Sequence, residues 1–243
     1  MNYPADLHTH TIASGHGTSS TIADMAKAAR AKGIALLGIT DHGPATMAAG
    51  TPSYFRSLIG APKYRCGVRV LYGIETNILD YDGRVDLEDS ILAKLDYAIA
   101  SIHHPNLLPG DIEANTRAYK QAMKHPKVKI IGHPDDTRYP IDYEDLAETA
   151  AEYGVILEVN NSSLSPEGYR GDVHPNYVRM LTACKRRRLP ILFSSDSHGP
   201  EHIGDFTYAE KMAEEMDYPK ELILNSRPAE IMAFLASDTT LGY

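Results

Sequence analysis

The chemistry that this chain of 243 residues can perform is indicated by its 11 histidines and by their positions. Histidine or a carboxylate follows six of the seven short apolar runs, at the point where each run ends. Imidazole and carboxylate groups that meet at one site can bind divalent metal ions and activate water for hydrolysis. Nine residues are therefore candidate metal ligands: His8, His10, His16, His42, Glu75, His103, His133, Asp196 and His198.

Two short motifs strengthen this metal hypothesis. His8 and His10 are two residues apart, so an extended backbone places both imidazoles on the same side. Asp196 and His198 repeat this spacing with a carboxylate and an imidazole. An isolated pair of this kind is a weak motif. Combined with four further histidine or glutamate residues at the ends of runs, it favours metal binding, because burying so many titratable groups without ions would cost free energy.

The number and type of these ligands predict several ions. Nine ligands exceed what one or two tetrahedral ions take from a protein, whereas three ions suit this number if Glu75 bridges two of them. A set rich in imidazole nitrogens fits zinc, iron or manganese better than calcium or magnesium. We therefore expect three divalent metal ions as cofactors, with zinc favoured and manganese or iron as alternatives.

These residues need a framework that brings distant parts of the chain together. Short apolar runs alternate with amphipathic stretches, a pattern typical of βα units around a parallel sheet. Strands are expected at 5–7, 34–39, 68–74, 96–102, 128–131, 155–159 and 191–193. Helices are expected at 22–32, 52–61, 113–124, 143–153, 176–188, 207–216 and 228–236, with a small hairpin around Asp82-Gly83. Because the carboxyl ends of parallel strands meet on one face, the candidate ligands are expected to converge there.

Length and composition restrict the class of protein. With 43% hydrophobic and 23% charged residues and no linker, residues 1–243 are expected to form a single α/β domain. The formal net charge of −8 argues against a general nucleic-acid surface, and no apolar stretch is long enough to predict a membrane span. Cys66 and Cys184 do not form a disulfide framework and no signal peptide is recognised, so a cytoplasmic location is expected.

Six motifs occur in a fixed order along the chain. They are Asp6-Leu7-His8-Thr9-His10-Thr11, Thr40-Asp41-His42-Gly43, Gly73-Ile74-Glu75, Ser101-Ile102-His103, Gly132-His133-Pro134 and Ser195-Asp196-Ser197-His198. This series resembles the motifs of the PHP family, named for polymerase and histidinol phosphatase, and is most similar to its stand-alone bacterial phosphatases. The resemblance implies the PHP fold, a distorted seven-stranded (βα) TIM-like barrel, with a trinuclear metal centre that hydrolyses phosphoesters.

The same resemblance divides the candidate ligands among three ions. It implies one ion held by His8, His10, Glu75 and Asp196, a second by Glu75, His103 and His133, and a third by His16, His42 and His198. Clustered divalent ions lower the pKa of a bridging water and so provide hydroxide near neutral pH. The predicted function is a metal-dependent phosphatase that hydrolyses small phosphomonoesters, with Glu75 as the bridging catalytic ligand.

Residues around the ligands have less specific predictions. Asp6 and Asp41 are adjacent to ligands and are candidates to orient imidazoles, or ordinary caps of strand ends. Arg170 and Arg138 are candidates to bind phosphate oxygens through bidentate hydrogen bonds, or solvated loop charges. His104 is next to a ligand and is either the general acid for the leaving alcohol or a structural histidine.

Other functions stay open at this point. An amidohydrolase-type barrel also begins with two histidines in this spacing, but it has a lysine at the fourth strand end, where this chain has His103. The same metals suit a phosphodiesterase or 3′-5′ exonuclease that acts on short nucleotides. A metal site can also stabilise a subunit without catalysis. The resemblance is compatible with a homo-oligomer.

Overall fold

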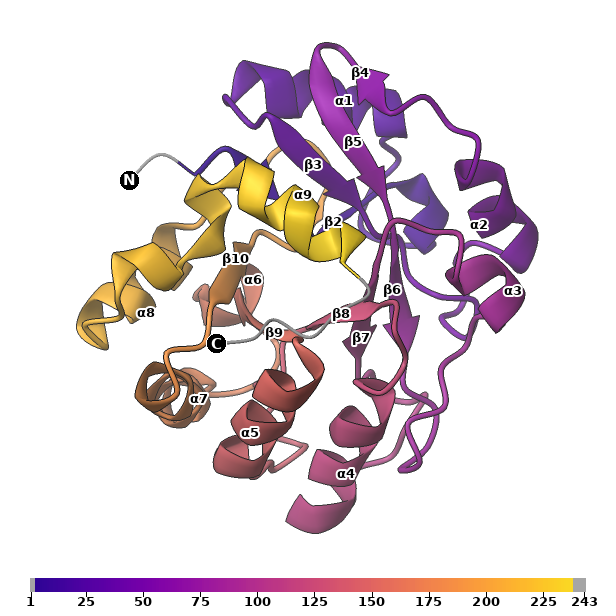
Figure 1. Cartoon of the computed structure of the whole chain (residues 1–243). Coiled ribbons are helices and arrows are strands. Elements are labelled where there is room, and N and C mark those ends of the chain that lie inside the picture. Colours follow the sequence, from indigo (N-terminus) through magenta and orange to yellow (C-terminus); the bar gives the residue numbers. More distant parts are fainter. Residues whose placement is uncertain (1–2, 238–243) are drawn as a thin grey trace.

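Parallel strands lie at the centre of the computed structural model, which describes residues 3–237, and helices lie outside them (Figure 1). The central strands are β1 (Ala5–Asp6), β3 (Leu36–Ile39), β5 (Val68–Tyr72), β6 (Ile74–Asn77), β7 (Ala98–Ser101), β8 (Val128–Ile131), β9 (Ile156–Asn160) and β10 (Ile191–Ser194). The shorter strands are β2 (Thr9–His10), β4 (Tyr64–Arg65) and β11 (Ser197–His198). The α-helices are α1 (Ile22–Ala31), α2 (Pro52–Leu58), α3 (Asp89–Leu92), α4 (Ile112–Ala122), α5 (Tyr143–Tyr153), α6 (Asn161–Leu164), α7 (His174–Arg186), α8 (Thr207–Glu215) and α9 (Pro228–Ala236). The 3-10 helices are η1 (Ile12–Ser14), η2 (Lys220–Leu222) and η3 (Leu224–Ser226).

The central strands form two sheets, and the chain passes directly from one sheet to the other between β5 and β6. One sheet has the order β1-β3-β5-β4, with only β4 antiparallel, and the other is the parallel sheet β10-β9-β8-β7-β6. Only Gly73 separates β5 from β6. A Cβ atom at this glycine would lie 2.8 Å from the backbone oxygen of Tyr97, so the absence of a side chain permits the close approach. The structure therefore confirms an α/β fold with parallel sheets.

The outer edges of the two sheets are joined by one side chain. Asn225, in η3, accepts a hydrogen bond at 2.7 Å from the backbone N–H of Phe193 in β10. Its Nδ2 donates to the backbone oxygens of Ala5 in β1, at 2.9 Å, and of Phe193, at 2.7 Å. Because Asn225 is fully buried, these bonds satisfy backbone groups that water does not reach. Strands β1 and β10 are thereby held beside each other.

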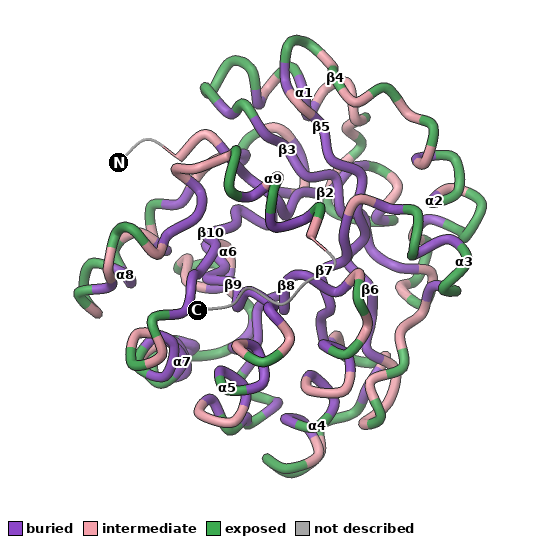
Figure 2. Tube along the Cα trace, viewed as in Figure 1, coloured by how far each residue is buried: buried purple, intermediate pink, exposed green. Residues whose placement is uncertain are grey.

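Nearly all residues of the central strands are buried, as the purple tube in Figure 2 shows. Leu36 and Ile130 belong to an inner apolar cluster, whereas the residues that follow them, Leu37 and Ile131, belong to the cluster that packs against the outer helices. This alternation explains why the strands are nearly continuous apolar runs in the sequence. Three apolar residues of α9, including Phe234, join the inner cluster, and α9 crosses the centre of the view in Figure 1.

Most expected elements are confirmed, and their bounds differ where local geometry decides them. The helices at 143–153 and 228–236 and the strand at 128–131 have the predicted bounds. The expected strand at 68–74 is instead interrupted at Gly73 and continues as β6. The helix expected from residue 176 begins at His174, because the proline that follows suits the first helical turn. The two-residue strands β2, β4 and β11 and the short helices α3 and α6 were not expected.

Local signals in the sequence set several turns and helix ends. Gly154 ends α5 in the left-handed conformation with a φ of 61°, which favours glycine. The backbone N–H of Leu79 donates to the oxygen of Arg84 at 2.8 Å, which confirms the hairpin around Asp82-Gly83. Within residues 3–237, no helix combines the length and the apolar character needed to cross a membrane.

Candidate metal centre

The candidate ligands gather where the parallel strands end. Only Glu75 lies inside a central strand, and the others follow a strand or a short helix. The positions are His8 and His10 after β1, His16 after η1, His42 after β3, Glu75 in β6, His103 after β7, His133 after β8, and Asp196 and His198 after β10. The topology therefore brings the nine predicted ligands to one end of the sheets.

Glu75 lies at the centre of this cluster and is fully buried. Its Oε1 is 2.8 Å from Nε2 of His133 and 3.2 Å from Nε2 of His103. Its Oε2 is 2.6 Å from Nδ1 of His42 and 3.4 Å from Nε2 of His8. Both oxygens of one carboxylate thus face imidazoles from different strands, which is the arrangement that a bridging ligand requires.

Asp196 and two histidines extend the cluster toward its open side. Oδ1 of Asp196 lies 3.1 Å from Nε2 of His10, and the ring of His198 stacks on the ring of His10 with centroids 4.1 Å apart. His16 is more exposed than the other candidates. Its ring nevertheless lies 4.9 Å from the rings of both His42 and His198, so it borders the same cluster.

The donor atoms form three overlapping groups, and within each group they lie within 4.8 Å of one another. The groups are His8, His10 and Glu75; His42, Glu75 and His103; and His10, His42 and His198. His10, His42 and Glu75 each belong to two of these groups, so the geometry supports several neighbouring ions. It does not assign each candidate ligand to one particular ion. The division implied by the family resemblance stays a prediction.

Several buried donor atoms of the cluster have no hydrogen-bond partner among the described residues. They are Nε2 of His8, His10, His103 and His198, Nδ1 of His42 and His133, and Oε2 of Glu75. An unpaired buried polar atom costs about 1–3 kcal/mol, so a native cluster of this kind needs another partner. Lone pairs of imidazole and carboxylate groups are ligands for zinc, iron and manganese, and the donor set therefore fits such ions.

The electrostatics of Glu75 and His10 favour the protonation states that bind metal. Burial raises the pKa of Glu75, but the imidazoles of His103, His8 and His42 lower it well below its ordinary value. Burial lowers the pKa of His10, and the neighbouring His198 and His42 lower it further. The glutamate is thus held as an anion and this histidine as a neutral base, the forms that coordinate a cation. At His8, by contrast, burial lowers the pKa but the carboxylates of Glu158, Glu75 and Asp196 outweigh it and raise the pKa well above its ordinary value.

Three of the candidate ligands have a hydrogen bond to one ring nitrogen, which leaves the other nitrogen directed into the cluster. The bonds join Nδ1 of His8 to Oε1 of Glu158 at 2.6 Å, Nδ1 of His103 to Oδ1 of Asn77 at 2.7 Å, and Nδ1 of His10 to Oγ of Ser14 at 2.8 Å. Such bonds fix the tautomer and the ring direction of a ligand. These three outer residues are not among the candidates that the sequence motifs indicate. Only Glu158 carried a signal, as a carboxylate inside an apolar run.

The two aspartates that were expected to orient imidazoles behave differently. Asp41 acts through an intermediate, because its Oδ1 accepts a hydrogen bond from Oγ of Ser14 at 2.7 Å, and Ser14 contacts the ligand His10. Asp6 bonds to no imidazole among the described residues. It accepts hydrogen bonds from Oγ of Ser195 at 2.6 Å and from the N–H of Gly204 at 2.9 Å, so it fixes the chain after β10 to β1.

Glu158→Gln is expected to weaken metal binding by about 10- to 100-fold, the usual cost of removing a group that orients a metal ligand. The fully buried Glu158 also accepts a hydrogen bond from the N–H of His133 at 2.7 Å, so its carboxylate positions two ligands. Competition with a chromogenic chelator measures the affinity. The matched control is Glu152→Gln, on the exposed side of α5. Equal affinities of the two variants would contradict the role of Glu158.

Of the residues expected to bind phosphate, Arg170 is the best placed. It is buried, and its Nη2 lies 3.5 Å from Oδ2 of Asp196. Arg138 instead pairs with Asp136, with Nη2 and Oδ2 2.5 Å apart, and its side chain is 43% exposed. His104 is exposed and makes no hydrogen bond within the described residues. The structure thus brings Arg170 to the cluster but leaves Arg138 and His104 outside it.

A family model and two similar relatives agree on the family of this chain. A model of the PHP domain matches residues 6–164. A "probable phosphatase" of Clostridium novyi (strain NT) is 40% identical over 237 residues, which cover 98% of this chain and 96% of that protein. A "probable phosphatase" of Shewanella sp. (strain MR-4) is 42% identical over 236 residues, which cover 97% and 92% of the two chains.

The fold is similar to a crystal structure of histidinol phosphate phosphatase from Lactococcus lactis, which was solved with zinc, L-histidinol and phosphate. The TM-score is 0.61 and the sequence identity 18%, and the match covers 89% of this chain and 95% of that one. At this identity the likeness concerns the fold alone. The family follows from the domain model, which matches more than half of the chain, and from relatives that cover nearly all of it. The chain belongs to the PHP domain family.

Proposed function

We propose that this phosphatase releases phosphate from small phosphomonoesters at a centre of three divalent metal ions, with zinc favoured over manganese or iron. The cluster around Glu75 carries this proposal, because several of its buried donor atoms have no hydrogen-bond partner among the described residues and suit such ions. The names of the relatives at about 40% identity and the zinc of the Lactococcus lactis enzyme support it.

The proposed ligand sets follow the family resemblance. One ion is assigned to His8, His10, Glu75 and Asp196, a second to Glu75, His103 and His133, and a third to His16, His42 and His198. The short distances from Glu75 to His133, His103 and His42 support a bridging role for its carboxylate.

When bound, the ions supply water activated near neutral pH and positive charge against the phosphoryl oxygens. The chain's own residues would position the metal ligands and the phosphoryl group. Glu158 and Asn77 fix the rings of His8 and His103. Arg170 offers a buried guanidinium to phosphoryl oxygens, and this charge-assisted bond strengthens as negative charge develops in the transition state.

The finer architecture is also proposed. If β5 and β6 count as one strand and Asn225 as the junction between β1 and β10, the two sheets form one distorted seven-stranded TIM-like barrel. Residues 1–243 would then be a single PHP domain. The unpaired Cys66 and Cys184 support a cytoplasmic location. A homo-oligomer is compatible with this proposal.

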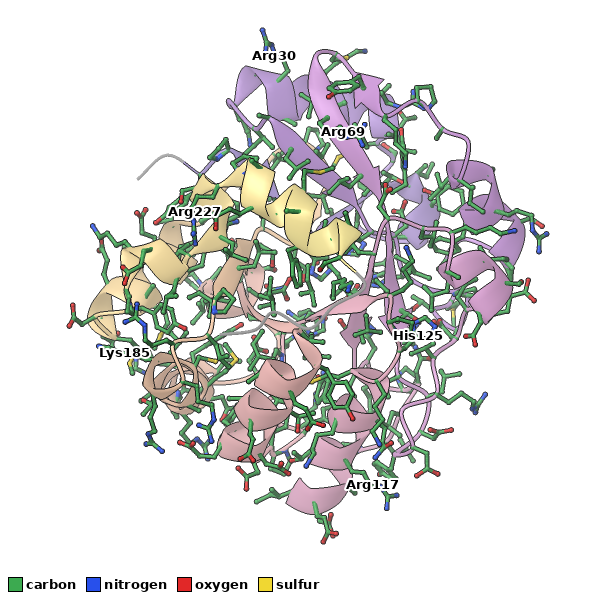
Figure 3. The ribbon with its side chains drawn as sticks, in the orientation of Figure 1. Arg30, Arg69, Arg117, His125, Lys185 and Arg227 are labelled. Carbon is green, nitrogen blue, oxygen red and sulfur yellow. The ribbon has the colours of Figure 1, made fainter. Side chains whose placement is uncertain are left out.

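The distribution of basic side chains supports a small substrate over a long nucleic acid. Residues 185–188 form the longest basic run in the sequence. Arg186 and Arg187 pair with Glu144, at 2.9 Å and 2.6 Å. Arg188 pairs with Glu221, so these charges are matched by carboxylates. Figure 3 shows the labelled cations of α1, α4 and α7 well apart, on separate sides of the molecule.

Removal of metal tests the proposal. Chelation of the purified protein is expected to lower phosphate release from a panel of phosphomonoesters by at least about 10²-fold, and added zinc or manganese is expected to restore it. The melting temperature should also fall, because ions that bind only the folded state stabilise it. Bis(p-nitrophenyl) phosphate serves as the diester in the same assay. A lower melting temperature without any change in turnover would favour a non-catalytic role, and release only from the diester would favour the phosphodiesterase.

A further inference from the structure

The amide of Asn77, beside the candidate ligand His103, decides which nitrogen of that imidazole is free. Oδ1 of Asn77 lies 2.7 Å from Nδ1 of His103, and Nε2 of His103 lies 3.2 Å from Oε1 of Glu75. An amide oxygen only accepts, so Nδ1 donates its proton and Nε2 keeps a lone pair. A reversed amide would present its NH₂ group to Nδ1, and the proton of a neutral ring would then lie on Nε2. The metal-binding form of His103 thus depends on the orientation of one amide.

The carboxylate of Asp86 is the group that fixes this orientation. Its Oδ2 accepts a hydrogen bond from Nδ2 of Asn77 at 2.6 Å, and its Oδ1 accepts one from the backbone N–H of Asn77 at 3.0 Å. An ionised carboxylate cannot donate, so the amide nitrogen has to face Asp86 and the amide oxygen has to face His103. Nδ2 of Asn106 also donates to this oxygen, at 2.7 Å. Because Asn77 is fully buried, its amide depends on these protein groups for its hydrogen bonds.

Asp86 is itself held by the strand and the loop that carry two candidate ligands. Oγ1 of Thr76, next to Glu75 in β6, donates to its Oδ1 at 2.6 Å. The backbone N–H of Ala45, in the loop that follows His42, donates to its Oδ2 at 2.9 Å. Together with the two bonds from the asparagine, this half-buried carboxylate accepts four hydrogen bonds, two at each oxygen. Only a group with two acceptor oxygens satisfies all of these donors.

We propose that Asp86 is a positioning residue of the candidate metal centre, and that its charge holds the Asn77 amide so that Nε2 of His103 can coordinate an ion. Asp86 acts through Asn77 and takes no part in the chemical step. The inference rests on the metal centre of the proposed function and adds a residue that supports it. Its test measures metal affinity, so the result does not depend on the release of phosphate.

Asp86→Asn keeps the size of the side chain but replaces one acceptor oxygen by a donor nitrogen, so two of the four donors lose their acceptor. The affinity of the metal-free protein for zinc is expected to fall by about 10-fold, the lower end of the usual effect of groups around metal ligands. Competition with a chromogenic chelator measures this affinity. Asp80→Asn is the matched control in the same hairpin, because Asp80 pairs with Arg84 at 3.0 Å instead of with Asn77. It should bind zinc with the wild-type affinity.

Asn77→Asp provides a second test, because the inference predicts opposite effects in two backgrounds. In the wild-type background the substitution opposes two carboxylates across the 2.6 Å contact with Asp86, and the zinc affinity is expected to fall by about 3- to 10-fold. In the Asp86→Asn background the amide at position 86 can donate to the new carboxylate, whose other oxygen accepts the proton of His103. The affinity is then expected to rise by about 3-fold above that of Asp86→Asn. Recovery is incomplete, because the N–H of Ala45 faces a nitrogen in the double variant.

Gly43→Ala displaces the carboxylate without changing any polar group. A Cβ atom at Gly43 would lie 2.3 Å from both oxygens of Asp86, so this side chain has to move away from its donors. The zinc affinity is expected to fall by about 3- to 10-fold. Gly60→Ala is the control and should keep the affinity, since a Cβ atom there meets no atom within 4 Å beyond its chain neighbours. Neither glycine has a left-handed φ, so the two substitutions differ in this contact.

The outcomes are distinct. Circular dichroism of the metal-free proteins establishes that each variant is folded, and Gly43→Ala tests the same contact should Asp86→Asn prove unfolded. Unchanged zinc affinity in both of these variants, or the same sign of the Asn77→Asp effect in both backgrounds, would overturn the inference and leave the proposed function intact. A wild-type protein that binds neither zinc nor manganese would overturn both. Zinc binding by the wild type without release of phosphate would overturn the proposed function alone.

Discussion

Glu75→Gln is expected to lower kcat/KM for phosphomonoesters by at least about 10³-fold, because a metal ion contributes several kcal/mol of transition-state stabilisation. The substitution keeps the shape of the side chain but removes its charge. Glu75 faces His133 and His103 with one oxygen and His42 and His8 with the other, so two of the three donor groups lose their anionic member. Bound metal per chain should fall in parallel.

Metal analysis by mass spectrometry and phosphate release on the same preparations check this result. Glu152→Gln removes one carboxylate charge from an exposed site on α5 and should leave both measurements unchanged. Circular dichroism establishes that the Glu75 variant is folded. Full metal content together with wild-type turnover in a folded Glu75 variant would refute the bridging assignment.

Arg170→Lys is expected to lower kcat/KM by about 10²-fold while the metal content stays at the wild-type level. Arg170 donates from Nη1 to Oγ of Ser163 at 2.7 Å and presents Nη2 toward Asp196 at 3.5 Å, so its guanidinium is held in one orientation. Lysine keeps the charge but loses the planar fork that binds two phosphate oxygens. Most of the loss should appear in kcat, because the bond strengthens as charge develops on the phosphoryl group.

A surface arginine provides the control for this substitution. Arg186→Lys makes the same change on α7, where the side chain pairs with Glu144 at 2.9 Å, and should keep normal kinetics. Loss of metal in proportion to loss of activity would show that Arg170 supports the ligands instead of binding phosphate. Arg138→Lys should have a smaller effect than Arg170→Lys, because Asp136 already occupies the guanidinium of Arg138.

Much of the candidate site could be predicted because its ligands follow a repeated local pattern. In a parallel α/β fold, each strand ends at the same face, so a histidine after an apolar run is directed to a common site wherever that run lies in the chain. This reasoning brought together His8, His42 and Asp196 without any knowledge of their distances. The family resemblance rested on the same residues, and the domain model confirms it.

Other features depend on contacts between residues far apart in the sequence. Glu158 forms a hydrogen bond with His8, which is 150 positions away in the sequence. Asn225 forms hydrogen bonds with both β1 and β10, the first and last of the central strands. A buried carboxylate in an apolar run indicates that some partner exists, but only the packing of strands selects which one. Asp6 illustrates the same limit. It is two residues from His8 in the sequence, but its carboxylate accepts a hydrogen bond from Ser195.

By itself, the sequence determined the alternation of strands and helices, the residue types of the candidate ligands and the end of the strands at which they lie. These properties follow from apolar periodicity and from chain direction, which are local. The tertiary structure decided that Glu75 faces imidazoles with both oxygens, that Arg170 is buried beside Asp196, and that the carboxylate of Asp86 contacts the amide of Asn77. These depend on the distances between side chains of different strands, which local sequence patterns do not encode.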